Sequence, residues 1–359
     1  MIPIPATKGE LTPEWLSSIL GLAGGNRVES VDLQPLGEKD SVSGYVYRAK
    51  LAYFHEILDR PGSVIVKLPK PRSLRTESLR SAYEREVKFY QILASQVGVP
   101  VPALIYADYD STNSDYVLVI EDFPDAVTVS NQTGASLQQA YSLLRYMAKL
   151  HARYWSDTKL LEHSFLNRTE SSIERFNDGF PKRLPLFLSR FGGLIHPDEM
   201  AVFNAFPRGF KEAVKPLMQA PQTLIHNDFA VKNILIRGGA EGAQSFVLLD
   251  WAIIGRGPGV RDLSFFIETS IPPKMRSEYE EAFLRHYWRE LCGEGVTNYS
   301  FEHLMEDYRR AVLVDLARIS WTGGQEPMVV FESIVRHNLR GRTGSAKELD
   351  LISLFREHS

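Results

Sequence analysis

The alternation of apolar and polar positions divides the chain into a strand-rich first part and a helix-rich remainder. A first helix is expected at about 12–21, because Thr12 can cap it and Pro13 suits its first turn. A second helix is expected over 76–94, where apolar residues recur at helical spacing. Runs of β-branched and aromatic residues predict strands, and they cover residues 43–54, 63–68 and 116–123.

Helical periodicity dominates the chain from residue 137 onwards. The exception is the block 223–249, where two short apolar runs bracket the loop 238–244 and predict a β-hairpin. The pattern therefore predicts an α+β protein, with a β-rich N-terminal part that contains one key helix and a larger, mainly helical C-terminal part. We expect two domains, 1–122 and 123–359, because 359 residues exceed what one small core usually accommodates.

The composition, with 44% hydrophobic and 24% charged residues, is that of an ordinary globular protein. A formal net charge of −3 favours neither a nucleic-acid surface nor an acidic tail. A single cysteine, Cys292, cannot form an internal disulfide, which fits a reducing compartment. The sequence contains no recognisable signal peptide and no run of 18 apolar residues. We therefore expect a cytoplasmic protein without a membrane or nucleic-acid partner.

The block LIHNDFAVKNILI places polar residues between apolar runs. Asp228 lies in the loop, Asn233 begins the first strand of the predicted hairpin, and Asp250 ends the second. Because hairpin pairing brings the start of one strand near the end of the other, we expect these residues to be neighbours. Two carboxylates and an amide oxygen suit Mg²⁺. The alternative is that each residue fills a turn locally, which explains each one singly but their convergence less well.

Lys67 lies in the middle of an apolar strand, SVIVKL. A buried lysine is costly unless it is paired, and the next helix offers Glu84 and Glu86 as partners. The alternative is a lysine on an edge strand that points into water. A strand lysine, a helix glutamate, a loop Asp with a later Asn, and an Asp after a strand are together the parts of a phosphoryl-transfer site.

Four segments resemble the aminoglycoside phosphotransferase superfamily, in particular its ecdysteroid-kinase-like and choline-kinase-like branch. They are EREVKFYQIL at 84–93, KLHARYW at 149–155, HNDFAVKN at 226–233 and LLDWAIIGRGPGVRDLSFFIETS at 248–270. The resemblance implies a bilobal protein-kinase-like fold, with a nucleotide-binding lobe at 1–122. It implies that the helical lobe contains a catalytic loop at 224–236, a metal-binding segment at 247–263 and a substrate-lining insert at 156–222.

The same resemblance implies roles for the residues of the second lobe and its metal segment. Asp228 would be the catalytic base, which accepts the proton of the attacking hydroxyl. Asn233 and Asp250 would be the Mg²⁺ ligands. His226 and Asp262 would support the catalytic loop.

The resemblance also implies the nucleotide contacts. Lys67 would hold the phosphates of ATP and be fixed by Glu86, which the E-x-x-F-Y spacing favours over Glu84. The sequence does not separate ATP from GTP as donor. The other contacts are expected from the lobe linker 119–123, which includes Glu121 and Phe123, and from the phosphate-covering loop 37–46, which includes Ser43 and Gly44.

Two departures from the family pattern stand out. Asn227 occupies the usual glycine position of the H-G-D motif. If this position needs a positive φ, Asn is among the residues that tolerate it best after Gly. The phosphate-covering loop lacks the G-x-G-x-x-G pattern, so its nucleotide contacts are the least defined by sequence.

A small-molecule acceptor is favoured over a protein, because only twelve positions separate Asp250 from Asp262 and leave no room for an activation loop. Residues 123–359 carry 28 Lys and Arg and 28 Asp and Glu, which gives no support to a polycationic substrate. Phenylalanines of the insert either line an apolar pocket or form core, so we lean towards a neutral or partly apolar alcohol. The alternatives are a catalytically silent nucleotide-binding module and a true aminoglycoside- or choline-type kinase. The oligomeric state stays open.

Overall fold

The structure, a computed structural model, describes residues 2–23, 25–37, 43–55, 60–238, 244–326, 332–340 and 348–356. The chain forms two compact units, Met1–Val127 with Leu235–Ile253 and Thr128–Ile234 with Ile254–Ser359. The prediction of an α+β protein in two lobes is confirmed. Among the helices of the described ranges, none has the length and apolar character needed to cross a membrane.

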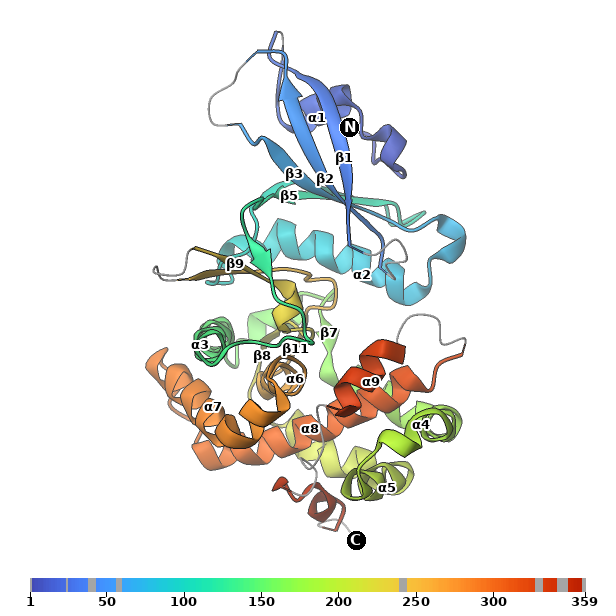
Figure 1. Cartoon of the computed structure of the whole chain (residues 1–359), viewed down its shortest axis with the longest axis vertical. Coiled ribbons are helices and arrows are strands. Elements are labelled where there is room, and N and C mark those ends of the chain that lie inside the picture. The colour runs from blue at the N-terminus through green and yellow to red at the C-terminus, as the bar shows by residue number, and fades with distance from the viewer. Residues whose placement is uncertain are drawn as a thin grey trace. The chain divides into compact units, whose positions relative to one another are not determined.

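The first unit is built on a five-stranded antiparallel sheet in the order β1-β2-β3-β5-β4 (Figure 1). Its strands are β1 (Val28–Leu36), β2 (Tyr45–Tyr53), β3 (Ser63–Leu68), β4 (Leu104–Tyr109) and β5 (Tyr116–Glu121). The leading helix α1 (Pro13–Ile19) begins where the sequence predicts, because Oγ1 of Thr12 accepts the backbone N–H of Trp15. The prediction of strands followed by one inserted helix therefore holds for this unit.

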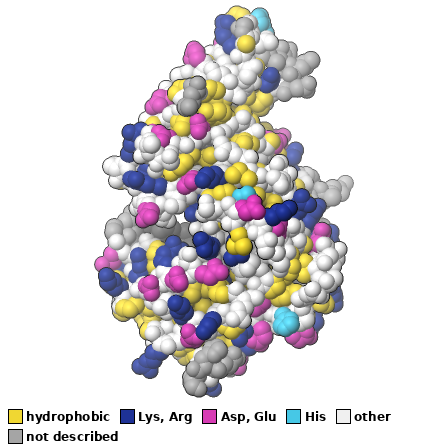
Figure 2. Space-filling view, turned by 180° about the vertical axis from the view of Figure 1, so that it is seen from behind, with side chains coloured by type: hydrophobic (Ala, Val, Ile, Leu, Met, Phe, Trp, Pro, Cys, Tyr) yellow, Lys and Arg dark blue, Asp and Glu magenta, His cyan; other side chains and the backbone are white. Residues whose placement is uncertain are grey.

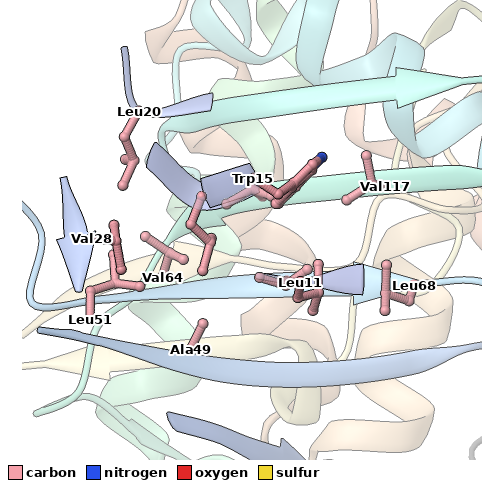
Figure 3. Close-up of a cluster of buried hydrophobic side chains, with 12 residues drawn as sticks. Leu11, Trp15, Leu20, Val28, Ala49, Leu51, Val64, Leu68 and Val117 are labelled. Atoms are coloured by element: carbon pink, nitrogen blue, oxygen red, sulfur yellow. The ribbon is translucent and has the colours of Figure 1, made fainter. Parts of the chain in front are cut away.

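The core of the first unit lies between α1 and one face of the sheet, as Figure 3 shows. Leu11 and Trp15 pack against Val64 and Val117, and Trp15 also meets the ring of Tyr106 edge to face at 5.9 Å. Burial of each large apolar side chain stabilises the fold by about 1.5–3 kcal/mol. The alternating burial along β3 leaves the residues between these apolar positions free to face away from the core.

The second predicted helix is interrupted. Helix α2 (Glu77–Lys88) is capped by Thr76 and continues as a π turn, η3 (Phe89–Leu93), before a 3-10 turn, η4 (Ala94–Gln96). A π turn adds a residue to the helical repeat and re-aims the side chains that follow. Phe89, the first residue of this turn, stacks on Trp251 with ring centroids 4.0 Å apart.

Residues 235–253 group with the first unit, whereas the sequence led us to expect them in the C-terminal domain. The reason is a set of long-range bonds. The backbone N–H of Leu248 donates to the carbonyl of Pro100 at 3.0 Å, and Arg85 donates to the carbonyl of Ala252 at 2.7 Å. Sequence patterns do not reveal such pairings, because they join segments more than 140 residues apart.

A small sheet in the order β10-β9-β6 contains the predicted hairpin. Strands β9 (Ile234–Arg237) and β10 (Ser245–Leu248) are hydrogen-bonded neighbours, and β6 (Val127–Thr128) lies beside β9. Positions 239–243 of the hairpin loop lie outside the described residues.

The second unit is mainly helical. Its helices in the described ranges are α3 (Leu137–Arg153), α4 (Thr169–Phe191), α5 (Pro197–Val214), α6 (Val260–Ser270), α7 (Pro273–Gly293), α8 (Phe301–Gly323) and α9 (Glu332–Arg340). A short sheet joins β7 (Asn167–Arg168) and β8 (Gln222–Ile225) to the two sides of β11 (Gly255–Pro258). Short 3-10 helices complete the described chain: η1 (Lys8–Glu10), η2 (Arg72–Leu74), η5 (Thr158–Glu162), η6 (Gly192–Leu194), η7 (Lys215–Met218), η8 (Val231–Asn233) and η9 (Leu351–Phe355).

The phenylalanines of the predicted insert form core. Seven of them are at most 4% exposed, namely Phe176, Phe180, Phe187, Phe191, Phe203, Phe206 and Phe210. Six of these pack ring against ring within α4 and α5, and Phe176 lies against Trp321 of α8. They therefore give no support to the apolar pocket considered from the sequence. Figure 2 shows basic and acidic side chains interspersed over one face of the molecule, as the near-neutral charge leads one to expect.

Candidate functional site

The first unit places Lys67 against two carboxylates. Lys67 lies on β3, and its Nζ donates to Oε1 of Glu86 on α2 at 2.6 Å. Oδ1 of Asp250 lies 3.9 Å from the same nitrogen. Glu84 instead pairs with Lys88 one turn along the helix. Lys67 is thus paired with Glu86 rather than pointing into water, and Glu86 is only 3% exposed.

Lys67 is held in its charged form. Burial by itself would lower the pKa of Lys67, but the negative charges of Glu86 and Asp250 outweigh burial and raise that pKa above its ordinary value. A permanently positive ammonium group beside an exposed carboxylate is suited to bind phosphate oxygens and a cation that accompanies them.

Gly44 directly precedes strand β2, opposite the end of β3. Its φ of +152° is one that L residues rarely adopt, and a Cβ there would lie 2.6 Å from the carbonyl oxygen of Leu68. Glycine therefore allows the chain to approach β3 closely, one residue beyond Lys67. Ser43 precedes it, whereas positions 38–42 of the expected phosphate-covering loop lie outside the described residues.

The expected lobe linker has fewer available backbone groups than the sequence suggested. The backbone N–H of Glu121 donates to the carbonyl of Ala103 at 2.9 Å, and the Glu121 carboxylate accepts the N–H of Ala103 at 3.1 Å. Phe123 lies beyond the strand, with the guanidinium of Arg237 4.8 Å from its ring. Of these two residues, Phe123 is the one whose backbone N–H could donate a hydrogen bond to the adenine ring of a nucleotide.

Asp250 sits at a sharp bend after β10. Its φ is +62°, and its side chain is 43% exposed. The next residue, Trp251, is fully buried and stacks on Phe89. The buried tryptophan fixes the bend, so the carboxylate of Asp250 is presented beside Lys67.

In the second unit, Asp262 holds the loop that leads to Asp228. Its fully buried carboxylate accepts the backbone N–H groups of His226 at 2.6 Å and Asn227 at 2.7 Å. His151 of α3 lies 3.3 Å from the same carboxylate and 2.7 Å from the hydroxyl of Tyr287. His151 comes from the KLHARYW segment, whose resemblance to the family pointed to that helix without assigning the histidine a contact. Asp262 thus holds the backbone just before Asp228, and the supporting roles of Asp262 and His226 stay predictions.

Asn227 has a φ of +66°, the left-handed conformation for which glycine is favoured. This explains why a glycine is usual at the position and why Asn, the residue type that best tolerates this φ, stands here. The bend turns the chain so that Asp228 follows directly after the two N–H groups held by Asp262.

Asp228 is surrounded by donors. Nδ2 of Asn233 donates to its carboxylate and to its backbone carbonyl, both at 2.9 Å. Nζ of Lys232 lies 3.1 Å from Oδ2, and the guanidinium of Arg318 lies 3.5 Å from Oδ1. Burial would raise the pKa of Asp228, but the charges of Lys232 and Arg318 outweigh it and lower the pKa. Asp228 is therefore a carboxylate at neutral pH and can accept a proton.

Two of these partners were not anticipated. Lys232 is exposed to solvent and also forms an ion pair with Asp228. Arg318 of α8 also donates to the carbonyl of Asn227 at 2.9 Å, and its guanidinium lies 4.1 Å from the ring of Phe265. Arg318 could have been found from the sequence in the same way as Lys67, because it is also a charged residue inside an apolar run, AVLVDLARIS.

The donor set fits a hard cation. The amide nitrogen of Asn233 is committed to Asp228, which turns the amide oxygen away from that carboxylate. An amide oxygen and the exposed carboxylate of Asp250 are the ligand types that Mg²⁺ takes, alongside waters and phosphates. No three His, Cys, Asp or Glu of the described ranges gather closely enough to hold a metal by themselves. The proximity of Asn233 and Asp250 stays a prediction, because they belong to different units.

A family model describing ecdysteroid kinase-like proteins matches residues 38–294. The chain belongs to the ecdysteroid kinase-like family. This confirms the resemblance inferred from the four motifs. No curated protein sequence matches the chain.

The fold of this family member is similar to that of several solved structures. An ethanolamine kinase from Plasmodium vivax is 14% identical, with a TM-score of 0.57 over 92% of this chain and 83% of that one. Choline kinase LicA from Streptococcus pneumoniae is 17% identical, with a TM-score of 0.54 over 94% and 96%. A protein of Ralstonia eutropha JMP134 assigned as an aminoglycoside phosphotransferase is 13% identical, with a TM-score of 0.59 over 96% and 97%. Family and fold together class the protein as a small-molecule kinase-like phosphotransferase.

Proposed function

We propose that the protein is an ATP- and Mg²⁺-dependent kinase that transfers the γ-phosphoryl group to a hydroxyl of a small molecule. The observation that carries the proposal is the fixed carboxylate of Asp228, oriented by Asn233 and kept ionised by Lys232 and Arg318. Phosphoryl transfer needs a positioned proton acceptor and neutralised phosphates more than a protein nucleophile.

In the proposed reaction, the acceptor oxygen forms a bond to the γ-phosphorus while the bond from that phosphorus to the β,γ-bridging oxygen breaks. The hydroxyl proton passes to the carboxylate of Asp228, and ADP leaves. Lys67, fixed by Glu86, would bind phosphate oxygens of the nucleotide. Ser43, Gly44 and the Phe123 backbone would complete the nucleotide contacts.

Mg²⁺ would be held by Asn233 and Asp250 and, when bound, neutralises charge on the phosphates. Two solved structures similar to this chain support a nucleotide ligand, since an aminoglycoside phosphotransferase was solved with GDP and kanamycin, and amicoumacin kinase with AMP-PNP and Ca²⁺. Whether ATP or GTP is the donor is decided by comparing the two at equal concentration.

The decisive test replaces the base without changing its shape. In Asp228→Asn we expect Mg·ATP to bind while phosphoryl transfer falls about 100-fold or more, because general-base catalysis typically contributes about 10²–10⁴-fold. Transfer is read by mass spectrometry as a phosphate mass gain across a panel of hydroxylated compounds. The control is Glu278→Gln, which also removes one negative charge, from an exposed carboxylate on α7. It should leave phosphoryl transfer unchanged.

Full transfer by Asp228→Asn would remove this residue from the mechanism. A wild-type protein that binds Mg·ATP but phosphorylates nothing in the panel, and hydrolyses no ATP, would contradict the kinase proposal and indicate a nucleotide-binding module.

A further inference from the structure

Three arginines lie on the packed helices α4 and α8 of the second unit, and one of them, Arg318, is paired with Asp228. Arg175 and Arg183 lie eight residues apart on α4, so they share one face of that helix. Arg318 lies on α8 next to Asp228. The ring of Trp321, also on α8, has the guanidinium of Arg183 4.0 Å from its centroid and that of Arg175 5.3 Å from it.

The contact between the two helices depends on Gly179, midway between the two arginines of α4. A Cβ at Gly179 would lie 2.8 Å from Cδ1 of Trp321. The absence of a side chain at Gly179 therefore leaves room for the edge of the Trp321 indole. The two arginines, one helical turn before and one after Gly179, can then reach the indole ring. The backbone of α4 thus fixes where Arg175 emerges.

Positive charge in this cluster exceeds negative charge. Within the described ranges, Asp228 is the one carboxylate within ion-pair distance of Arg175, Arg183 or Arg318, and it is reached by Arg318 alone. Among the residues that the structure describes, Arg175 has only the hydroxyl of Ser172, at 3.3 Å, as a hydrogen-bond partner. Burial lowers the pKa of Arg175, and the neighbouring charge of Arg318 lowers it further. Mutual repulsion of guanidinium groups is relieved when an anion binds between them.

A purely structural role accounts for Arg183 but not for Arg175. Arg183 donates to the backbone carbonyl of Trp321 at 3.1 Å and stacks closely on its ring, which is how an arginine joins two helices. Arg175 stands farther from the ring and makes no bond to α8, and the residue as a whole is exposed to solvent although its guanidinium is partly shielded. Its donors are available to a ligand.

We propose, on the basis of the kinase function proposed above, that Arg175 and Arg318 bind an anionic group of the acceptor, a carboxylate, sulfate or phosphate, while its hydroxyl faces Asp228. The acceptor is then a hydroxylated organic anion rather than the neutral or cationic alcohol weighed from the sequence. The nucleotide is not the expected occupant, because its candidate phosphate partner, Lys67, belongs to the first unit, whereas the arginines share a unit with the proton acceptor.

The test measures binding on one scaffold in three charge states, with the protein saturated with Mg·AMP-PNP so that nucleotide sites are filled. The probes are 4-(hydroxymethyl)benzoate, its amide and its aminomethyl analogue, with 4-(hydroxymethyl)phenyl phosphate and the corresponding sulfate as further anions. We expect at least one anion to bind 10-fold or more tightly than the amide and the amine. The member of the anion set that binds best identifies the anionic group.

Arg175→Gln should weaken binding of that anion about 10- to 100-fold, the loss expected for charge-assisted hydrogen bonds, and leave the affinity for Mg·AMP-PNP unchanged. The matched control is Lys211→Gln, which removes one positive charge from an exposed position on α5 of the same unit. It should bind the anion as the wild type does.

Three results would overturn the proposal: no anion binding at millimolar concentration, equal binding of the three charge states, or anion binding that Arg175→Gln leaves intact. Binding that disappears when AMP-PNP is added would place the anion at the nucleotide site and overturn it as well. Failure of the kinase function looks different, since Mg·AMP-PNP itself would then fail to bind or phosphoryl transfer would not depend on Asp228.

Discussion

Three charged side chains, Lys67, Asp228 and Arg318, stand in apolar segments of the chain. Lys67 is kept ionised by Glu86 and Asp250, and Asp228 is kept ionised by Lys232 and Arg318. A buried charge persists only when it is paired and hydrogen-bonded, so such residues mark places where charge itself is needed. At the scale of the residue, the charges of the candidate site are therefore paired with opposite charges. The positive charge of Arg175 is the exception, because no carboxylate of the described residues pairs with it.

Backbone conformation at Asn227 can be tested by comparing Asn227→Gly with Asn227→Ala. Both variants lose the side chain, but only alanine must adopt a positive φ that disfavours a Cβ. We expect Asn227→Ala to have a free energy of unfolding about 1–2 kcal/mol lower than Asn227→Gly, measured by chemical denaturation. The difference isolates the backbone, because the lost side-chain contacts are common to both. An alanine variant as stable as the glycine variant would show that the bend relaxes.

At the scale of the element, position depends on how closely two strands approach. The start of β2 lies against the end of β3, where Lys67 pairs with Val46 across the sheet. Gly44 allows this approach, and the π turn after α2 sets Phe89 against Trp251 and so orients the bend at Asp250. Gly44 and the π turn both shape the part of the proposed site that would bind the nucleotide. Gly44 acts because it lacks a side chain, and the π turn acts because it adds a residue to the helical repeat.

Gly44→Ala should weaken nucleotide binding without unfolding the first unit. The added Cβ would lie 2.6 Å from the Leu68 carbonyl, so β2 or β3 must shift and Lys67 with it. We expect the Kd for Mg·ATP, measured by calorimetry, to rise about 10-fold, which corresponds to about 1.4 kcal/mol. Gly62→Ala is the control, since this glycine directly precedes β3 of the same sheet and a Cβ there meets nothing within 4 Å. Equal affinities in the two variants would contradict the role given to Gly44.

At the scale of the whole molecule, positive and negative charges are nearly balanced. In the second unit, the carboxyl of Asp307 has a pKa well above its usual range. Asp307 accepts a hydrogen bond from the hydroxyl of Tyr299 at 2.8 Å. Burial raises the pKa of Asp307 from 3.8 to about 6, against the opposing effects of Tyr299 and Arg310. A folded-state pKa above the unfolded one favours the folded state below pH 4, and this contribution is lost as the pH rises through 6.

Asp307→Asn should therefore stabilise the protein at pH 7 and have little effect at pH 4. The amide keeps an oxygen for Tyr299 but carries no charge to desolvate. We expect a gain of about 1–2 kcal/mol at pH 7, reduced from the full shift because the group is partly solvated, and a higher thermal midpoint. The exposed Glu278→Gln should show no such pH dependence. A destabilised Asp307→Asn at pH 7 would show that the ionised form is the better hydrogen-bond partner.

The sequence by itself determined the elements and the first residues of the site. Local patterns located β2, β3 and β5, the helix that carries Glu86 and the hairpin after Asn233, because burial of one face imposes a repeat that can be read locally. They did not locate the edge strand β1. Charges inside apolar runs drew attention to Lys67 and Asp228. The φ of Asn227 was also foreseeable, since Gly and Asn are the residues that favour a left-handed bend.

Only the tertiary structure decided which distant segments meet. It brought Arg318 to Asp228 from 90 residues away, joined residues 235–253 to the first unit and turned the phenylalanines of the insert into core. It also placed Arg175 beside Trp321, and so suggested an anionic acceptor where the sequence favoured a neutral one. A repeat in the sequence fixes which face of a helix is buried, whereas its partner is selected by packing and charge over the whole chain.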